Sequence, residues 1–276
     1  MLSFRILGPL EVRDEQAAIA LGGPRQRALL VALLLRAGRV VPIEQLVDEL
    51  YGEDPPKTAT TSVQNAIVAL RKALGPELLV RRPPGYVLQV EREQVDAHHF
   101  EGLLADARRA STEERRALLV RALELWRGPA LAEFAFEDWA QTETRRLEEL
   151  RLVALEERIE AELMLGRGSS VVAELTRLVR EHPLRERLRA QLMCALYRSG
   201  RQVEALEVYR DGREALIERL GLEPGPALQE LERAILNHDP KLGAARSLPR
   251  RPASRRGAVV LIRRAHPGRG RGRSGV

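Results

Sequence analysis

Side chains suited to reading nucleic acid gather between Lys57 and Arg82, where five residues are basic and one, Glu77, is acidic. A helical pattern from about Thr58 to Leu74 turns a mostly uncharged face of short side chains outward. Amides and hydroxyls can bond base edges in the major groove of DNA, and small apolar groups can touch thymine methyls. We therefore predict DNA contacts along this face, with base edges reached by Thr61, Ser62, Asn65 and Val68 and flanked by Gln64.

Basic residues at the end of this helix and in the turn after it extend the predicted contact to the DNA backbone. Leu78–Val80 and Tyr86–Val90 are typical of two strands, and the turn between them is basic. Cations placed here would meet phosphates or, from the turn, enter the minor groove. The residues predicted for this role are Arg71, Lys72, Arg81 and Arg82, with Tyr86 as a further contact. A solvated helix face beside an ordinary hairpin has the same spacing and stays open as an alternative.

Three helices and several strands are expected to position these residues. Short strands interrupted by Gly8 and Pro9 precede a core helix that starts near Pro24, and a second helix runs from about Ile43 to Leu50. In the third helix, an apolar stripe within about 40° would face the core; it consists of Val63, Ile67, Leu70 and Leu74. Strands, three helices and a β-hairpin in this order predict a winged helix-turn-helix, whose third helix enters the major groove.

The charge of the chain is divided unevenly. The whole sequence carries +6, which by itself favours an anionic partner. Residues 1–95 hold 12 basic and 11 acidic residues, and residues 96–240 hold 22 and 28. Residues 241–276 hold 11 basic residues and no acidic ones. The basic surplus therefore belongs to the tail, which is rich in Arg, Gly and Pro and is predicted to be disordered. Either the tail binds phosphates without specificity, or it is an extension that only adds charge.

From residue 96 to about 240 the pattern is helical and repetitive. Gly166 and Gly200 are 34 residues apart, the length of a helix–turn–helix tetratricopeptide unit. The small and large residues of such a unit are represented by Leu196, Gly200, Ala205 and Tyr209. Stacked helical units bury a continuous core and leave a broad surface that suits protein binding better than catalysis. The excess of acidic residues argues against this part being the main DNA contact.

Motifs around the predicted DNA contact resemble a known family. Leu70–Gly75 followed by Arg82–Tyr86 is similar to the end of the recognition helix and the wing of OmpR-type regulators. The Pro-Pro-Gly-Tyr form, together with Phe4–Leu10 and Gly23–Leu29, resembles the branch called Streptomyces antibiotic regulatory proteins, the AfsR/DnrI/RedD family. Members often carry Arg where this chain has Ala69, directly before the Leu-Arg pair, so the DNA target is expected to differ from a typical member's.

The helical part resembles the bacterial transcriptional activation domain of the same family. Its similar motifs are Val95–Phe100, Ala122–Leu131, Glu181–Glu186, Gly200–Tyr209 and Leu220–Pro226. With the N-terminal motifs, the resemblance covers residues 1 to about 240. It implies a nucleoid-associated transcriptional activator that binds promoter direct repeats near the −35 region as a homodimer on the DNA. The absence of a bilayer span and of a signal-peptide pattern favours a cytoplasmic location. It also implies recruitment of RNA polymerase to secondary-metabolite genes, such as those for antibiotics.

The sequence predicts no enzyme, cofactor or metal site. Gly22–Pro24 lacks the lysine of a phosphate-binding loop, and His98 and His99 are adjacent with no further ligand at a suitable spacing. Cys194 is the single cysteine, so no disulfide within the chain is expected, and its apolar surroundings predict a buried side chain. No apolar run approaches the roughly 20 residues of a bilayer span, so no membrane association is expected.

These patterns predict a mainly α fold. Residues 1–95 would form an α+β winged helix-turn-helix that binds DNA, and residues 96–240 an all-α, tetratricopeptide-like helical-repeat domain. Residues 241–276 would form the basic tail. The alternative function is that of a helical-repeat scaffold or adaptor, whose N-terminal domain binds protein rather than DNA.

Overall fold

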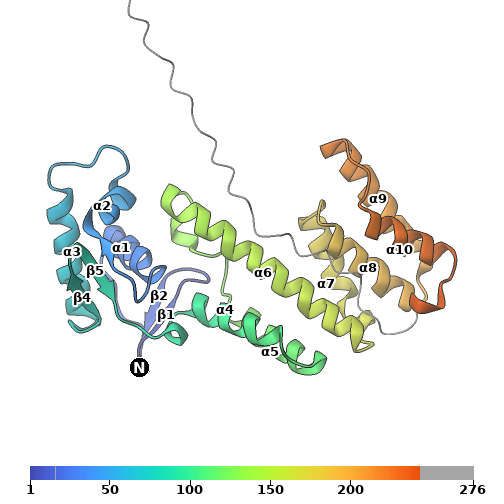
Figure 1. The fold of residues 1–276 in the computed structure, drawn as a ribbon, viewed down its shortest axis with the longest axis horizontal. Helices are drawn as coiled ribbons and strands as arrows, with labels where there is room; N and C mark the ends of the chain where they lie inside the picture. Colours follow the sequence, from blue (N-terminus) through green and yellow to red (C-terminus); the bar gives the residue numbers. More distant parts are fainter. Residues whose placement is uncertain (16, 243–276) are drawn as a thin grey trace, which may run out of the picture.

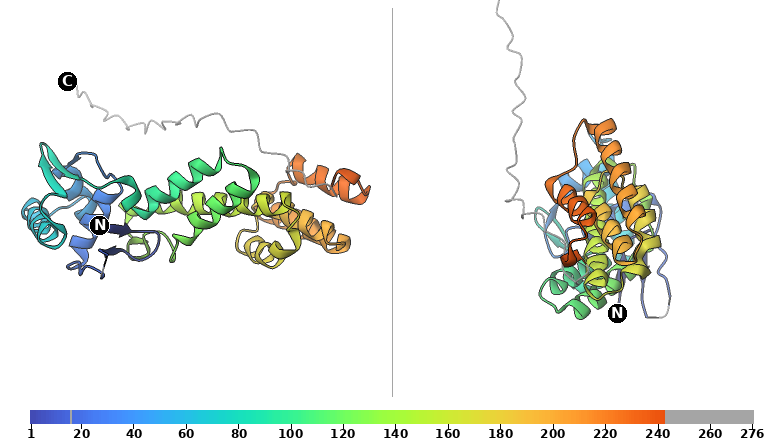
Figure 2. Two further views of the ribbon diagram at one scale, coloured as in Figure 1. Left: turned by 90° about the horizontal axis from the view of Figure 1, so that it is seen from below. Right: turned by 90° about the vertical axis from the view of Figure 1, so that its right-hand side faces the viewer.

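The computed structural model describes residues 1–15 and 17–242, which form an elongated molecule with the strands at one end (Figure 1). The left view of Figure 2 shows the later helices extending away from that end, and the right view looks along the long axis of the molecule. The strands are β1 (Ser3–Arg5), β2 (Glu11–Arg13), β3 (Val41–Pro42), β4 (Leu79–Arg82) and β5 (Gly85–Leu88). The α-helices are α1 (Pro24–Leu34), α2 (Ile43–Tyr51), α3 (Ala59–Leu74), α4 (Asp96–Ala107), α5 (Thr112–Glu124), α6 (Asp138–Met164), α7 (Gly168–Glu181), α8 (Glu186–Arg198), α9 (Gln202–Leu220) and α10 (Pro226–Leu236). Three short 3-10 helices are η1 (Arg92–Gln94), η2 (Ala132–Phe134) and η3 (Pro240–Leu242). The tail predicted to be disordered lies outside the described residues from residue 243 onward.

The N-terminal part has the winged helix-turn-helix fold that the sequence predicts. β1 and β2 form an antiparallel pair in which Phe4 lies opposite Val12. A second sheet has the order β3-β5-β4, with antiparallel neighbours, and its β4–β5 hairpin is the wing. α1, α2 and α3 pack against one another, and α3 follows α2 as the second helix of the pair. The predicted third helix, from about Thr58 to Leu74, is confirmed with a start at Ala59.

Local residue choices explain the elements around the wing. Pro24 stands in the first turn of α1, where its missing N–H costs no helical hydrogen bond. Gly75 ends α3 with a φ of 106°, a left-handed conformation that favours glycine. A Cβ on Gly85 would lie 1.8 Å from the carbonyl oxygen of Val41, so only glycine lets β5 approach β3 at this point.

The remaining helices fold back on one another along the chain. α4 packs on α5, α5 on α6, α7 on α8 and α8 on α9, as expected for helical repeats. α6 is the longest, with 27 residues, and it runs from the winged helix toward the α7–α10 group (Figure 1). The expected mainly α fold, a winged helix followed by a helical domain, is confirmed.

The apolar core does not divide at residue 95. One continuous cluster of buried residues contains Phe4 and Leu29 of the winged helix together with Phe100 of α4 and Leu147 of α6. Phe100 also meets Trp126 edge to face, with ring centroids 5.4 Å apart. The winged helix therefore shares its core with α4, α5 and the first half of α6.

A second core begins in the later half of α6. It includes Leu152 and Ile159 of α6 and extends through α7, α8, α9 and α10. Ala205 and Tyr209 are both buried in it, as the repeat spacing predicts. Cys194 is buried here too, and burial raises the pKa of its thiol to about 12, so it is a structural residue.

Candidate nucleic-acid interface

The outer face of α3 is open to solvent along its length. Thr61, Gln64, Asn65 and Lys72 are exposed and Ser62 is partly exposed, whereas the opposite stripe of Val63, Ile67, Leu70 and Leu74 is buried. Val68 has 64% of its surface exposed, although it is apolar. The structure thus brings the six predicted residues of this helix face onto one accessible surface.

The wing lies next to this surface. Arg81 and Arg82 are exposed at the end of β4, and the turn to β5 consists of Pro83 and Pro84. A shallow pocket of about 160 Å³ separates α3 from the wing, and its lining includes Thr60, Gln64, Arg81 and Tyr86. Thr60 was missed by the sequence reasoning because it lies beside the outer stripe of α3, where periodicity alone does not predict a contact.

Two of the predicted contacts have partners inside the protein. The Nε of Arg71 donates a hydrogen bond of 2.8 Å to the carbonyl oxygen of Leu79 in β4. Its guanidinium carbon lies 5.9 Å from the centre of the Tyr86 ring, within the range of a cation–π contact. Tyr86 is 7% exposed. Arg71 and Tyr86 therefore connect α3 to the wing from the protein side of the predicted interface.

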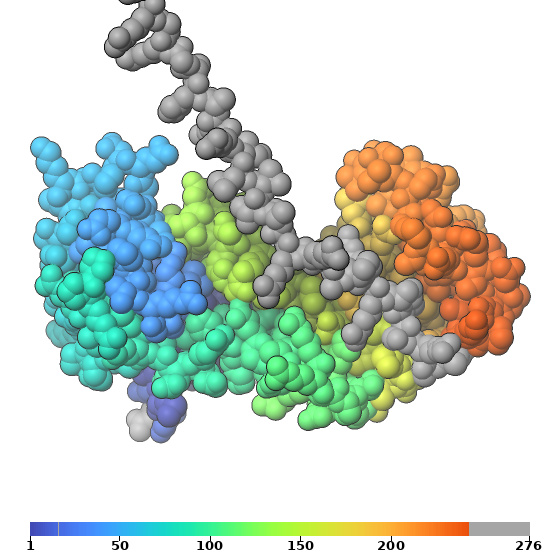
Figure 3. Space-filling view, in the orientation of Figure 1, coloured from blue at the N-terminus to red at the C-terminus, as the bar shows by residue number. Residues whose placement is uncertain are grey.

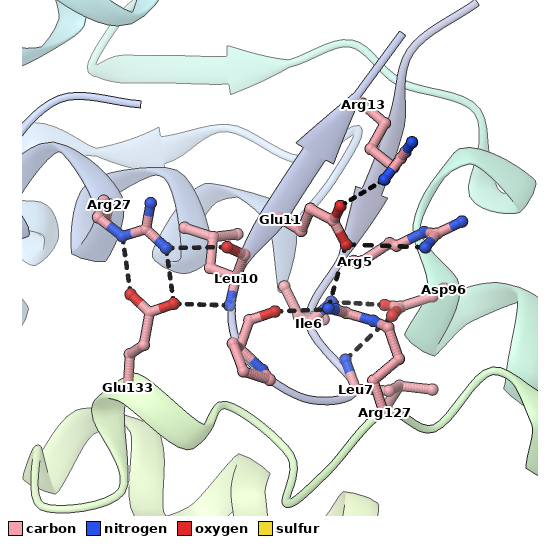
Figure 4. Close-up of polar contacts among 11 residues, drawn as sticks. Arg5, Ile6, Leu7, Leu10, Glu11, Arg13, Arg27, Asp96, Arg127 and Glu133 are labelled. Atoms are coloured by element: carbon pink, nitrogen blue, oxygen red, sulfur yellow. Dashed lines mark hydrogen bonds and ion pairs between the residues drawn. The ribbon is translucent and has the colours of Figure 1, made fainter. Parts of the chain in front are cut away.

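A buried carboxylate links the winged helix to the helical half (Figure 4). Asp96, the first residue of α4, accepts hydrogen bonds from the backbone N–H groups of Ile6 at 2.8 Å and Leu7 at 3.0 Å. Burial raises the pKa of Asp96 above its ordinary value, and the two backbone bonds and the nearby Arg127 offset part of this rise. The start of α4 is thereby tied to the end of the first strand.

An ion pair makes a second link on the other side of the same loop (Figure 4). The Nε of Arg27 donates to one carboxylate oxygen of Glu133 at 2.7 Å, and its Nη2 donates to the other at 2.6 Å. Arg27 also donates to the carbonyl of Leu10, and Glu133 accepts from the N–H of Leu10, both at 2.8 Å. The hydrogen bonds from Arg27 hold the pKa of Glu133 below its ordinary value.

Arg127 completes the contact between the two halves. It donates to the carbonyl of Pro9 at 2.8 Å and to the carboxylate of Glu11 at 3.2 Å. Its backbone N–H donates to the carbonyl of Leu7 at 2.8 Å, and the N–H of Leu131 donates to that of Ile6 at 2.9 Å. We call these contacts of Asp96, Arg127 and Glu133 with residues 6–11 and Arg27 the junction.

Sequence reasoning did not predict the junction, although a signal for it was present. The motifs that carried the family resemblance include Phe4–Leu10, Gly23–Leu29, Val95–Phe100 and Ala122–Leu131. These four segments, far apart in sequence, meet at the junction. Their shared position accounts physically for motifs that showed no chemistry of their own.

Neither metal ligands nor membrane helices are found in the part of the chain that the structure describes. No three His, Cys, Asp or Glu side chains there gather in a way that could hold a metal ion. No described helix is both long and apolar enough to cross a bilayer.

Comparison with known proteins gives two family matches. Residues 95–236 match the model of the bacterial transcriptional activator domain. Residues 17–88 match the model of the C-terminal domain of transcriptional regulatory proteins. The two matches therefore cover the helical part and most of the winged helix.

Individual relatives are regulatory proteins. The chain is 43% identical over 245 residues to the regulatory protein AfsR of Streptomyces griseus, which covers 87% of this chain but only 25% of AfsR. It is 37% identical over 268 residues to the regulatory protein DnrI of Streptomyces peucetius, covering 92% of this chain and 98% of DnrI. The chain thus spans about a quarter of AfsR and nearly all of DnrI.

A solved structure shows the same arrangement of domains. EmbR of Mycobacterium tuberculosis, in complex with a low-affinity phosphopeptide, superposes with a TM-score of 0.82 at 35% sequence identity. The similarity covers 86% of this chain and 65% of the EmbR chain.

Proposed function

The chain belongs to the Streptomyces antibiotic regulatory protein family of transcriptional regulators, and from this premise we propose that it is a sequence-specific, DNA-binding activator. One observation carries the proposal. α3 exposes a face of uncharged polar side chains and the apolar Val68. This face lies directly beside the two exposed arginines of the wing. This combination of base-reading and phosphate-binding groups is what a winged helix needs to bind a duplex.

The individual contacts divide into three roles. Thr61, Ser62, Gln64, Asn65 and Val68 would lie at base edges in the major groove. Lys72, Arg81 and Arg82 would contact phosphates or, from the wing, the minor groove. Arg71 and Tyr86 would act indirectly, because their side chains are already engaged with Leu79 and with each other.

The partners follow from the family. We propose that two copies bind direct repeats near the −35 region of a promoter as a homodimer on the DNA. The helical domain, residues 96–240, would then recruit RNA polymerase to secondary-metabolite genes, in the cytoplasm at the nucleoid. This division of labour leaves DNA reading to residues 1–95, which agrees with the acidic surplus of the helical part.

Selection of binding sites from a library of random duplexes tests the proposal. We expect one enriched motif, a DNase footprint over it, and affinity that falls steeply with salt. Three phosphate contacts in each of two copies correspond to a slope of about −5 in a plot of log K against log salt concentration. No enrichment and no footprint at low salt would contradict DNA reading and favour the adaptor alternative.

A further inference from the structure

Phe136, in the loop between η2 and α6, is an aromatic residue whose side chain takes no part in the core. The chain has four Phe, two Trp and four Tyr. Nine of these ten side chains are buried or partly buried, whereas Phe136 is 96% exposed. Because an aromatic side chain can bury about 150–250 Å² of surface, one left in solvent is a ready anchor for another protein.

The loop that presents Phe136 has a defined conformation. Phe134 donates its N–H to the carbonyl of Leu131 at 2.7 Å, and Glu137 donates its N–H to that of Phe134 at 3.0 Å. The Phe134 ring packs against Trp139, with centroids 5.6 Å apart. The loop is thus held from within on both sides of Phe136, which lowers the entropy cost of binding a partner.

The charges beside Phe136 indicate what kind of surface it fits. Glu137 and Asp138 follow it directly, and both are exposed. The nearby Arg27 donates its hydrogen bonds to Glu133 rather than to these two carboxylates. An aromatic side chain followed by two carboxylates is complementary to an apolar pocket with a basic rim.

The position of the loop leaves the predicted DNA surface free. The N-terminal end of α6 lies on the helical side of the winged helix, whereas α3 and the wing lie at the outer end of the molecule (Figures 1 and 3). The junction holds η2 against α1 through Arg27 and Glu133. A protein that binds Phe136 would therefore stand at a set position relative to DNA bound by α3.

We propose that Phe136, with Glu137 and Asp138, docks into a basic-rimmed apolar pocket on the RNA polymerase holoenzyme. The inference rests on the proposed function and names the surface through which recruitment would occur. Phe136 is the anchor in the pocket, and the two carboxylates face the basic rim.

Transcription from a promoter that carries the selected binding site, with purified RNA polymerase holoenzyme of the host, tests this docking. Phe136→Ala is expected to lower activated transcript about tenfold or more, the effect of removing an aromatic anchor. Glu137→Gln with Asp138→Asn is expected to lower it less, by an amount that shrinks as salt rises. DNA affinity should stay within twofold of wild type in both variants. Val203→Ala, at a 68% exposed apolar residue of α9, is the matched control and should leave transcription unchanged.

A thiol at the same position identifies the partner directly. Cys194 is buried with a raised pKa, so in Phe136→Cys the new cysteine is the accessible thiol for a cleavable crosslinker. We expect crosslinks on the promoter complex to map to a basic surface of a polymerase subunit or its σ factor. Crosslinks only to a second copy of this chain would instead identify Phe136 as a self-association contact and overturn the proposal.

The remaining outcomes separate the two levels of inference. Wild-type transcript with Phe136→Ala, or loss of DNA affinity in parallel with loss of transcript, would overturn the docking surface alone. Wild-type protein that binds no DNA or activates no transcript would overturn the proposed function as well.

Discussion

The guanidinium of Arg27 donates two hydrogen bonds to the carboxylate of Glu133, 106 residues away in sequence. Arg27 also donates to the carbonyl of Leu10, and Glu133 accepts from the N–H of Leu10. Arg27 belongs to α1 of the winged helix and Glu133 to η2 of the helical half. The pair therefore joins the element that supports α3 to the element that presents Phe136.

Removing this pair is expected to destabilise the fold. Arg27→Ala should lower the free energy of unfolding by about 1–2 kcal/mol, because a partly buried ion pair and a hydrogen bond to a backbone carbonyl are lost together. Urea denaturation at pH 7 measures the change. Arg201→Ala is the matched control, since Arg201 pairs with Glu204 within one exposed turn of α9, and it should show no measurable change. Equal effects of the two variants would contradict a structural role for the junction.

Asp96 should respond to pH in the opposite direction from Glu133. Asp96→Ala leaves two buried N–H groups without an acceptor and should cost about 2–4 kcal/mol at pH 7. Asp96→Asn retains an acceptor and should cost less. The pKa of Asp96 is raised in the folded state above its ordinary value near 3.8. Between these two pKa values, the folded state therefore binds the proton more tightly than the unfolded state does.

Wild type should therefore gain stability relative to Asp96→Asn as pH falls through that window. The pKa of Glu133 is lowered instead, so the stability it contributes is present above its ordinary value and is lost as pH falls through the folded one. Denaturation of wild type and the Asn variant between pH 7 and pH 4 measures the difference. If the difference in free energy of unfolding between wild type and Asp96→Asn became smaller as the pH fell, Asp96 would instead be stabilised in its ionised form.

Base reading and phosphate binding can be separated on α3. Asn65→Ala should change the preferred base at one position and cost about 1–3 kcal/mol on the selected site. Lys72→Ala should weaken binding to all duplexes alike and reduce the salt slope by about 1 for each bound copy. Titrations of the selected and scrambled duplexes at several salt concentrations test both. Arg210→Ala, at an exposed arginine of α9, is the control and should change neither quantity.

Arg71 and Arg82 should have different roles, the first in stability and the second in DNA binding. Arg71→Ala loses a hydrogen bond to Leu79 and the contact with Tyr86, so it should lower stability by about 1–2 kcal/mol. Arg82 is exposed, so Arg82→Ala should leave stability unchanged and reduce the salt slope of DNA binding by about 1 for each bound copy. Thermal unfolding and DNA titration of both variants would distinguish the roles, and identical profiles would contradict the distinction.

Specific binding should not need the basic tail. A chain ending at Leu242 loses ten arginines and no acidic residue. It should recognise the selected site with wild-type preference, because the residues proposed to read bases and phosphates lie between residues 61 and 82. A fall in its affinity for scrambled duplexes would show that the tail binds phosphates. Loss of preference for the selected site would show that the tail takes part in recognition.

The outer face of α3 could be predicted because it depends on near neighbours in sequence. The 3.6-residue repeat alone separates the buried Val63 and Ile67 from the exposed Asn65 and Val68. The partner of Arg71 could not be predicted in this way. Its side chain flanks the outer face, and only the folding of the wing over α3 decides that its guanidinium meets Leu79.

The hydrophobic periodicity could not reveal the junction for a similar reason. Asp96 meets Ile6 across 90 residues, and Glu133 meets Leu10 across 123. No periodicity connects positions so far apart, and a short acidic side chain at a helix start is ordinary at the surface. The shared core of the winged helix and α6 was hidden likewise, since both sides show only the usual apolar stripes.

The shared core has a geometric consequence for a bound promoter. Because the winged helix and the first half of α6 share one core, the base pairs bound by α3 would fix the direction in which the helical half projects from the duplex. Repeats one helical turn apart, about 10.5 base pairs, would align two copies on the same side of the DNA. Five additional base pairs between the repeats would rotate one copy by about half a turn, onto the opposite side. Promoter architecture would then be constrained by helical phase as much as by sequence.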